Sequence, residues 1–330
     1  MSNLWEGSRR QARGLSFGTA VALLASTGLA AAADIPSRKR MPPVVEAPVV
    51  EESKLIDFTF GFRAASDYNF RGISQSDRGF SPQGYGELQL FDNFLYAGVA
   101  GYGVDLPTKP LAEIDLTAGI RPKLGPLTFD FGVIGYIYPD ETQFFDPFTG
   151  GVLTPRDTDF VELAGKVSWN IEDRFILGGG VFHTGDFLGS GANATYVNAT
   201  AKYNIPETIL PAGFAISGEI GHYSLGRVDQ YLGGFELVDY TYWNAGVSYT
   251  YKNVTLDLRY HDTDLSKNEC FINTTDPRGV FSGSGRSKWC SDAFVATLSV
   301  DFVASQLGIF APSQPSGPPR ETAAGGVSVR

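Results

Sequence analysis

The sequence predicts an all-β fold, an antiparallel transmembrane β-barrel of the outer-membrane type with about 12 strands. Three observations predict it: many segments in which apolar and polar residues alternate, an N-terminal export signal, and almost no helical pattern. In one such segment Ile114, Leu116, Ala118 and Ile120 alternate with polar residues or glycine. Because successive side chains of a strand point to opposite faces, each of these strands has one apolar and one polar face.

The first 33 residues are predicted to be a signal peptide. Three arginines precede an apolar core between Leu15 and Leu29, and Ala31-Ala32-Ala33 offers a cleavage site before Asp34. The signal predicts export, with cleavage near Ala33, to the outer membrane of a Gram-negative bacterium. Residues 34–54 are rich in proline and charge and are predicted to be a periplasmic linker.

The barrel is predicted to span residues 55–302, followed by a disordered C-terminal tail over residues 303–330, which is rich in proline and small residues. After residue 33 no run of eighteen apolar residues occurs, so a helical membrane span is not expected in the mature protein. Loss of the signal peptide, with three Arg and one Glu, takes the formal net charge from −10 to −12. An exported protein this acidic is a poor candidate for nucleic-acid binding.

Alternation places the strands in order along residues 55–71, 81–91, 94–103, 112–122, 126–138, 158–169, 173–183, 193–203, 212–223, 239–250, 253–262 and 292–302. The connections between them are alternately short and long. Tight turns are predicted at residues 92–93, 122–125, 170–172 and 251–252, and long loops at 104–111, 139–157, 184–192, 224–238 and 263–291. Short periplasmic turns and long extracellular loops are typical of outer-membrane barrels, although residues 204–213 are long for a periplasmic turn.

Aromatic residues at outward positions predict two belts at the lipid–water boundaries. Six lie at the ends of strands next to the short turns: Phe91, Trp169, Tyr203, Tyr249, Tyr251 and Phe302. Tyr68, Phe70, Trp243 and Tyr260 are predicted to form the second belt, because the alternation of the first strand, continued to residue 71, turns Tyr68 and Phe70 toward lipid.

Charged residues fall on the inward positions of the strands. An Arg or Lys facing lipid at mid-bilayer would cost about 2–4 kcal/mol, so these side chains must point into the lumen. The candidate pore-lining residues are Arg63, Asp67, Asn69, Arg71, Asp115, Arg121, Asp130, Glu162, Lys166, Glu219, Asp257 and Arg259, and the same face carries Asp57, Glu87, Lys202 and Asp301. The excess of acids predicts a mild preference for cations if water fills the lumen.

Two interpretations of this interior stay open. In one, the lumen is a water-filled path whose charged walls select solutes. In the other, acids and bases pair across the lumen and hold it shut. We hypothesise that Arg63, Asp67 and Arg71 form part of an upper constriction; the alternative is that they only pin the first strand to its neighbour.

The segment SDYNFRGISQSD, from Ser66 to Asp77, resembles the signature of the TorF family of porins. Shorter segments resemble the family in the same order, such as YHDTDL at residues 260–265. The likeness covers about residues 57–302. It implies an outer-membrane β-barrel that acts as a channel, without an agreed substrate.

The only two cysteines, Cys270 and Cys290, are predicted to form a disulfide in the long loop 263–291, since an exported protein meets an oxidising compartment. They leave no thiol for a metal site. The alternation pattern does not determine whether this loop folds inward or outward.

An enzyme and a metal site are not expected. The run His222-Tyr223-Ser224 resembles the H-x-S element of outer-membrane phospholipases, but Leu225-Gly226 follows where that family has Asn-Gly. Three scattered histidines make no metal site. Acidic loop residues could hold Ca²⁺ from outside, yet they lack regular ligand spacing: Asp140, Glu141 and Asp146, and the pair Asp262 and Asp264.

The sequence therefore predicts a porin-like channel for passive diffusion of small hydrophilic solutes or ions, with no cofactor. Its expected partners are outer-membrane lipids and the solutes, and a homo-oligomer is left open. The alternative is a closed structural or adhesive barrel without transport, whose binding surface would be loops 139–157 and 263–291.

Overall fold

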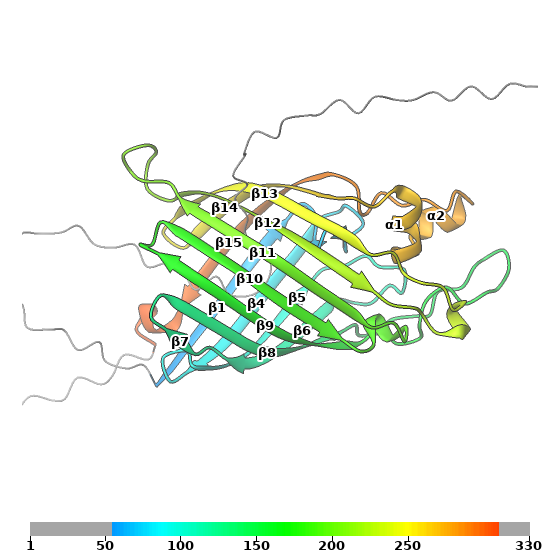
Figure 1. Ribbon diagram of the computed structural model, residues 1–330, viewed down its shortest axis with the longest axis horizontal. Coiled ribbons are helices and arrows are strands. Elements are labelled where there is room, and N and C mark those ends of the chain that lie inside the picture. The colour runs from blue at the N-terminus through cyan, green and yellow to red at the C-terminus, as the bar shows by residue number, and fades with distance from the viewer. Residues whose placement is uncertain (1–54, 310–330) are drawn as a thin grey trace, which may run out of the picture.

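Twelve long strands form a closed antiparallel barrel in the computed structural model, which describes residues 55–309 (Figure 1). Each strand pairs with the next one along the chain, and β1 pairs with β15 to close the wall. The strands are β1 (Ile56–Ala65), β4 (Ser81–Leu90), β5 (Leu95–Tyr102), β6 (Glu113–Ile120), β8 (Leu127–Ile137), β9 (Phe160–Ile171), β10 (Phe175–Thr184), β11 (Ala194–Asn204), β12 (Phe214–Leu225), β13 (Tyr240–Tyr251), β14 (Val254–Thr263) and β15 (Ala293–Val303). The predicted fold class is thus confirmed.

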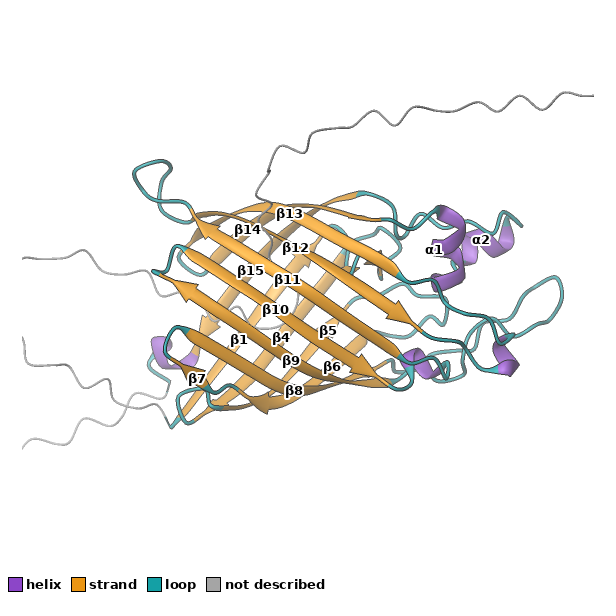
Figure 2. Cartoon of the chain, in the orientation of Figure 1, coloured by secondary structure: helices purple, strands orange, loops and turns teal. Residues whose placement is uncertain are grey.

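The remaining elements are short. β7 (Lys123–Leu124) extends the turn before β8, while β2 (Asn69–Phe70) and β3 (Ile73–Ser74) pair only with each other. The helices are α1 (Lys267–Thr274), α2 (Pro277–Phe281) and the 3-10 turns η1 (Phe187–Gly189), η2 (Gln230–Leu232) and η3 (Ala304–Leu307). Figure 2 shows strands along the whole wall and helices only at its two ends. None of the helices within residues 55–309 is long and apolar enough to cross a membrane.

The two ends of the barrel differ as the loop lengths predict. The short turns, the start of β1 and η3 lie at one end, and α1 and α2 lie with the long loops at the other (Figure 1). The longer turn at residues 204–213 lies on the short-turn side because it joins β11 to β12 there. An even number of antiparallel strands places both ends of the wall on one side.

The sequence predicted a disordered tail from residue 303, but the chain stays ordered for several residues after Phe302. β15 continues to Val303, and η3 follows it. The Ser305 amide donates to Asp57 Oδ1 at 3.0 Å and its hydroxyl donates to Oδ2 at 2.6 Å, which holds this segment to the foot of β1. The rest of the predicted tail, from residue 310, and the predicted signal peptide and linker (1–33 and 34–54) lie outside the described residues.

The outer face of the wall is apolar. Leu116 and Phe131, at the middle of two neighbouring strands, expose 49% and 51% of their surface, although each belongs to a regular strand. Near the short turns aromatic rings pair across strands, Phe175 with Tyr203 and Phe214 with Tyr249, at centroid distances of 4.7 and 4.6 Å. This arrangement matches the apolar band and aromatic belt of a barrel that faces lipid.

An arginine on this face should destabilise the barrel strongly if lipid surrounds it. We expect Leu116→Arg to lower the free energy of unfolding in lipid vesicles by about 2–4 kcal/mol. Leu111→Arg, in an exposed loop, is the matched control and should change it by less than about 0.5 kcal/mol. Equal losses for the two variants would contradict a lipid-facing wall.

The first strand is shorter than predicted, and this changes the direction of two aromatic side chains. β1 ends at Ala65, and the chain then turns into the lumen. The hydroxyl of Tyr68 donates to Glu113 Oε1 at 2.6 Å, and the ring of Phe70 contacts that of Tyr136 on β8. The prediction that Tyr68 and Phe70 face lipid was therefore wrong, since alternation holds only while the strand continues.

Candidate functional site

A hairpin inside the barrel is the centre of the candidate site. It lies at the end that carries the long loops, which we call the upper end. We call residues 66–80 the lumenal hairpin. Its two-residue turn, Arg71-Gly72, joins β2 to β3, with φ of 47° at Arg71 and 89° at Gly72. Positive φ at both positions defines the tight hairpin turn that favours Asn-Gly or Gly-Gly. An arginine in this left-handed conformation is disfavoured, so its side-chain contacts must offset the cost.

Side chains within the hairpin fix its shape. Asn69 Oδ1 accepts from the Gly72 amide at 3.0 Å. Asp67 Oδ1 accepts from the hydroxyls of Ser74, at 2.6 Å, and Ser76, at 3.0 Å. The predicted residues Asp67 and Asn69 therefore brace the hairpin and hold Arg71 at its tip.

Arg71 crosses the lumen to the far wall. Its Nη1 and Nη2 atoms each lie 2.7 Å from one carboxylate oxygen of Glu162 on β9, and the Tyr136 hydroxyl donates to Glu162 Oε2 at 3.0 Å. The exposed fractions are 6% for Arg71 and 0% for Glu162. This paired, two-point contact is the strong form of the Arg–carboxylate interaction.

Four aromatic rings surround the same guanidinium. Its Cζ atom lies 4.5–4.9 Å from the ring centroids of Phe70, Phe182, Tyr196 and Tyr223. Cation–π attraction strengthens where water is excluded, as it is here. Arg71, Glu162 and these rings form a compact plug across the upper lumen.

A second layer of polar contacts lies beside the plug. Glu219 accepts from the Tyr196 hydroxyl at 2.7 Å and from Asn198 Nδ2 at 2.6 Å. Arg259 Nη2 lies 2.9 Å from Asp257 Oδ2, and its Nη1 donates to Asn244 Oδ1 at 2.6 Å. Asn244 Nδ2 also donates to Glu219 Oε2 at 3.4 Å, so these contacts link β11 to β14 through β12 and β13 along the inner face of the wall.

The short-turn half of the lumen holds a separate charged network. Arg121 makes a two-point contact with Glu87, at 2.6 and 2.7 Å, and its Nε atom lies 3.2 Å from Asp130 Oδ2. Lys166 Nζ reaches the same Asp130 oxygen at 3.0 Å. The side chain of Lys166 is 30% exposed and that of Asp130 is 13% exposed, so water reaches this part of the wall.

The structure separates the three residues of the predicted constriction. Arg71 alone spans the lumen. Asp67 lies within the hairpin, and Arg63 lies on the wall with its guanidinium 5.5 Å from the centroid of the Tyr85 ring. Asp115, also predicted to line the pore, is buried on β6 in the same inward row as Glu113.

The tyrosines of the inner face were not among the residues predicted to line the lumen. Tyr196, Tyr223, Tyr240 and Tyr242 are at most 2% exposed and pack into one cluster. Their inward positions could have been inferred, because Tyr240 and Tyr242 share alternation with the polar Asn244. Aromatic residues were expected at the outer belts instead.

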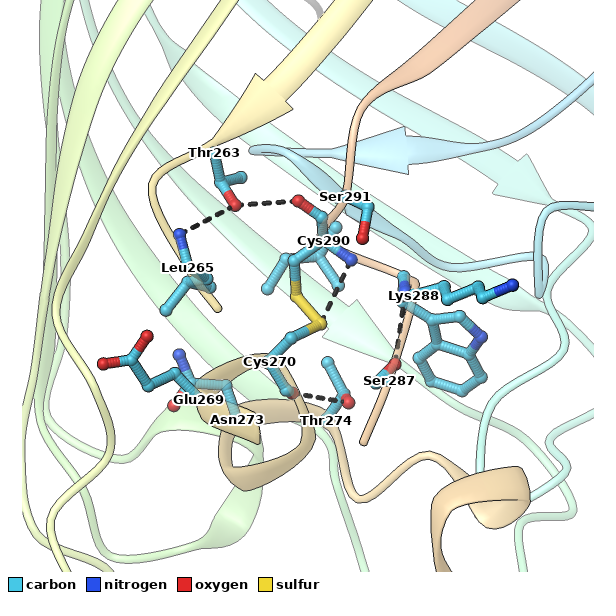
Figure 3. The surroundings of a disulfide bond; sticks show 12 residues. Thr263, Leu265, Glu269, Cys270, Asn273, Thr274, Ser287, Lys288, Cys290 and Ser291 are labelled. Atoms are coloured by element: carbon cyan, nitrogen blue, oxygen red, sulfur yellow. Dashed lines mark hydrogen bonds between the residues drawn. A yellow bond between two sulfur atoms is a disulfide. The ribbon is translucent and has the colours of Figure 1, made fainter. Parts of the chain in front are cut away.

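The loop of residues 263–291 folds inward over the hairpin. The predicted disulfide between Cys270 and Cys290 is present, and the Thr263 hydroxyl donates to the Cys290 carbonyl at 2.8 Å (Figure 3). The Ser74 amide donates to the Trp289 carbonyl at 3.0 Å, and Trp289 Nε1 donates to Asp77 at 2.7 Å. The disulfide loop thus holds the lumenal hairpin from above.

The acidic loop residues gather differently from the predicted set. Carboxylate oxygens of Glu141, Asp157 and Asp159 lie within 4.8 Å of one another. Asp146 instead accepts hydrogen bonds from Phe148 and Thr149 in its own turn. Glu141 Oε1 accepts from the Thr158 amide, and Asp159 Oδ1 accepts from the Tyr138 amide.

The histidines have ordinary partners. His222 Nδ1 lies 3.3 Å from Thr241 Oγ1 on the outer face, and His183 Nδ1 lies 2.9 Å from Thr195 Oγ1. His261 faces the lumen, where its Nδ1 lies 2.9 Å from the Tyr242 hydroxyl. Each contact orients a ring within the wall.

Taken together, the geometry defines a class: a closed twelve-strand barrel with an apolar exterior, a charged lumen and a hairpin plug. The chain belongs to the family described as bacterial protein of unknown function (Gcw_chp), whose model matches residues 51–290. This match does not confirm the resemblance to the TorF family. No curated protein matches the chain.

The chain is also similar, at low TM-scores, to solved structures of porins. The NanC porin is 13% identical, with a TM-score of 0.43 over 75% of this chain and 98% of that chain. The KdgM porin is 7% identical, with a TM-score of 0.42 over 74% and 98%. OmpT of Vibrio cholerae is 9% identical, with a TM-score of 0.37 over 75% and 97%.

Proposed function

We propose that this protein is an outer-membrane, porin-like channel for passive diffusion of small hydrophilic solutes or ions, narrowed by the lumenal hairpin. The observation that carries the proposal is the contrast between the two halves of the lumen. Charged side chains such as Lys166 reach water below, whereas Arg71 and Glu162 are buried above. A polar, hydrated wall that meets one narrow barrier is the arrangement that selects solutes.

The apolar outer face supports the location in a membrane, because so much exposed hydrocarbon would otherwise drive aggregation. Outer-membrane lipids are the partners of that face, and the solutes are partners of the lumen. We also propose that the protein has no catalytic activity, since His222, the residue nearest to a phospholipase motif, pairs with Thr241. A phospholipase assay of the wild type and His222→Ala should give the same background rate.

Ion selectivity tests the channel directly. We expect purified, refolded protein in planar bilayers to give discrete current steps with a mild preference for K⁺ over Cl⁻, because inward acids outnumber inward bases. Lys166→Glu, on the hydrated wall, should shift the reversal potential in a KCl gradient further toward the K⁺ potential. Lys252→Glu, in an exposed short turn, should leave it within experimental error.

The rival is a closed structural or adhesive barrel, which the buried plug favours. In that case the wild type would be silent in bilayers. Current steps from the wild type exclude it, and the reversal potential of Lys166→Glu then shows whether ions pass along the charged wall.

A further inference from the structure

A half-enclosed cavity lies above the lumenal hairpin, among the long loops. Its volume is about 150 Å³. Phe70, Tyr223 and Tyr240 contribute from the side of the plug, while Leu153 and Ile272 contribute from two different loops. The cavity therefore lies at the loop end of the barrel and is separated from the charged lumen by the plug.

The chemistry of this cavity is the opposite of that of the lumen. None of the described residues that line it is Asp, Glu, Lys or Arg, although such residues dominate the inner wall below. Leucine, isoleucine, valine, phenylalanine and proline supply much of its surface. A charged ligand would lose its hydration here without gaining a partner of opposite charge, which is strongly unfavourable.

Several polar groups of the lining already have protein partners, and the Tyr223 hydroxyl, which has none among the described residues, is buried. Both amide atoms of Asn273 bind the backbone of Val238, each at 2.8 Å. Thr154 Oγ1 accepts from the Phe144 amide at 2.9 Å, and the Thr158 hydroxyl donates to Glu141 at 2.6 Å. The effective lining is thus apolar, and a ligand has little to hydrogen-bond.

The volume of the cavity suits a ligand with one ring. An engineered apolar cavity of roughly 150 Å³ in another protein stays dry and binds benzene. The walls are held in place, because Ile272 lies in α1, which the Cys270–Cys290 disulfide anchors. A preformed cavity spares the ligand the cost of ordering loops.

We propose that this cavity is a binding site for one uncharged, monocyclic aromatic or alicyclic compound arriving from the loop side. The inference does not depend on conduction, since the cavity lies on the loop side of the plug. A bound ring would contact Phe70 and Tyr240, which belong to the plug and to the tyrosine cluster beneath it.

Calorimetric titration of the full-length protein in detergent micelles tests the proposal, with empty micelles as the blank. The probes are p-cresol, which is neutral at pH 7, and benzoate, which has similar size and one negative charge. We expect saturable binding of one p-cresol per chain and affinity for benzoate lower by at least about tenfold. Equal affinities for the two probes would overturn the proposal, as would no saturable heat with p-cresol.

Two variants locate the binding. Ile272→Glu places a charge at the cavity and should weaken p-cresol binding by about tenfold or more. Phe235→Ala removes a contact from a half-exposed position, leaves folding intact, and should weaken binding by about fivefold. The matched control is Phe148→Glu, on an exposed loop residue outside the cavity, which should leave the affinity unchanged. Wild-type affinity in Phe235→Ala, or an equal loss in Phe148→Glu, would refute the site.

Discussion

Arg71→Ala is expected to raise single-channel conductance, because it removes the only side chain of the lumenal hairpin that makes a two-point ion pair with the far wall. The truncation also leaves Glu162 buried without its cation. Breaking a buried ion pair on one side costs about 3–5 kcal/mol, which will weaken the docked position of the hairpin. The measurement is the current through single refolded barrels in a planar bilayer at fixed voltage and salt.

A double variant separates the loss of the barrier from the loss of stability. Arg71→Ala with Glu162→Gln removes the uncompensated charge, so it should recover much of the thermal stability while the conductance stays high. Arg227→Ala is the control for a lost surface arginine, since Arg227 pairs with exposed Glu236 and donates to the Gly234 carbonyl within one long loop. Conductance of Arg71→Ala equal to that of Arg227→Ala would remove the hairpin from the conduction path.

The wall of the barrel could be predicted from the sequence because its rule is local. Lipid outside and polar groups inside impose a period of two on every strand, so one segment such as residues 114–121 already shows which side faces the membrane. Loop lengths then order the two ends. The sequence also predicted that Arg121, Asp130 and Lys166 face the lumen. It did not predict which acid pairs with which base, because that depends on strand register.

The plug could not be predicted, because its geometry depends on contacts far apart in the chain. Alternation from Phe58 is interrupted only at Ala65-Ser66 and resumes in the same phase to Arg71 in the sequence, yet the strand ends at Ala65. One local signal was available: Arg71-Gly72 supplies a glycine to a two-residue turn, and Asp67, Ser74 and Ser76 can cross-brace it. The partner that makes the turn stable, Glu162, lies ninety-one residues further along the chain.

The plug separates two chemically distinct compartments of the barrel, the charged lumen and the apolar cavity. Below Arg71 the wall is charged and partly hydrated; above it, the lining is neutral and apolar. The boundary between them is formed by Phe70, Tyr223 and Tyr240, which all line the cavity. On the other side, Phe70 and Tyr223 contact Arg71, and Tyr240 packs in the cluster of inner-face tyrosines. Anything that displaces the hairpin will therefore change both compartments together.

Removal of the disulfide is expected to loosen the hairpin from above. Cys270 and Cys290 are 20 residues apart, and a bridge across a loop of this length stabilises by about 3 kcal/mol. In the same loop the Trp289 carbonyl accepts from the Ser74 amide and Trp289 Nε1 donates to Asp77, so release of the loop should weaken two contacts that hold the hairpin. We expect the variant with both cysteines changed to serine to show faster proteolysis within residues 267–289 and more frequent current fluctuations.

Comparison of this variant with reduced wild type and with Arg71→Ala shows whether the faster proteolysis and the current fluctuations both result from loss of the disulfide. Dithiothreitol on the wild type should reproduce the serine variant, because the chain has no other cysteine to reduce. Arg71→Ala should raise conductance while the loop stays resistant to proteolysis, since the bridge and its anchors at Thr263 and Cys270 are intact. If cleavage of the loop left the current unchanged, the hairpin would be held by Arg71 and Glu162 without the loop. The disulfide would then stabilise only the loop and the cavity that the loop lines.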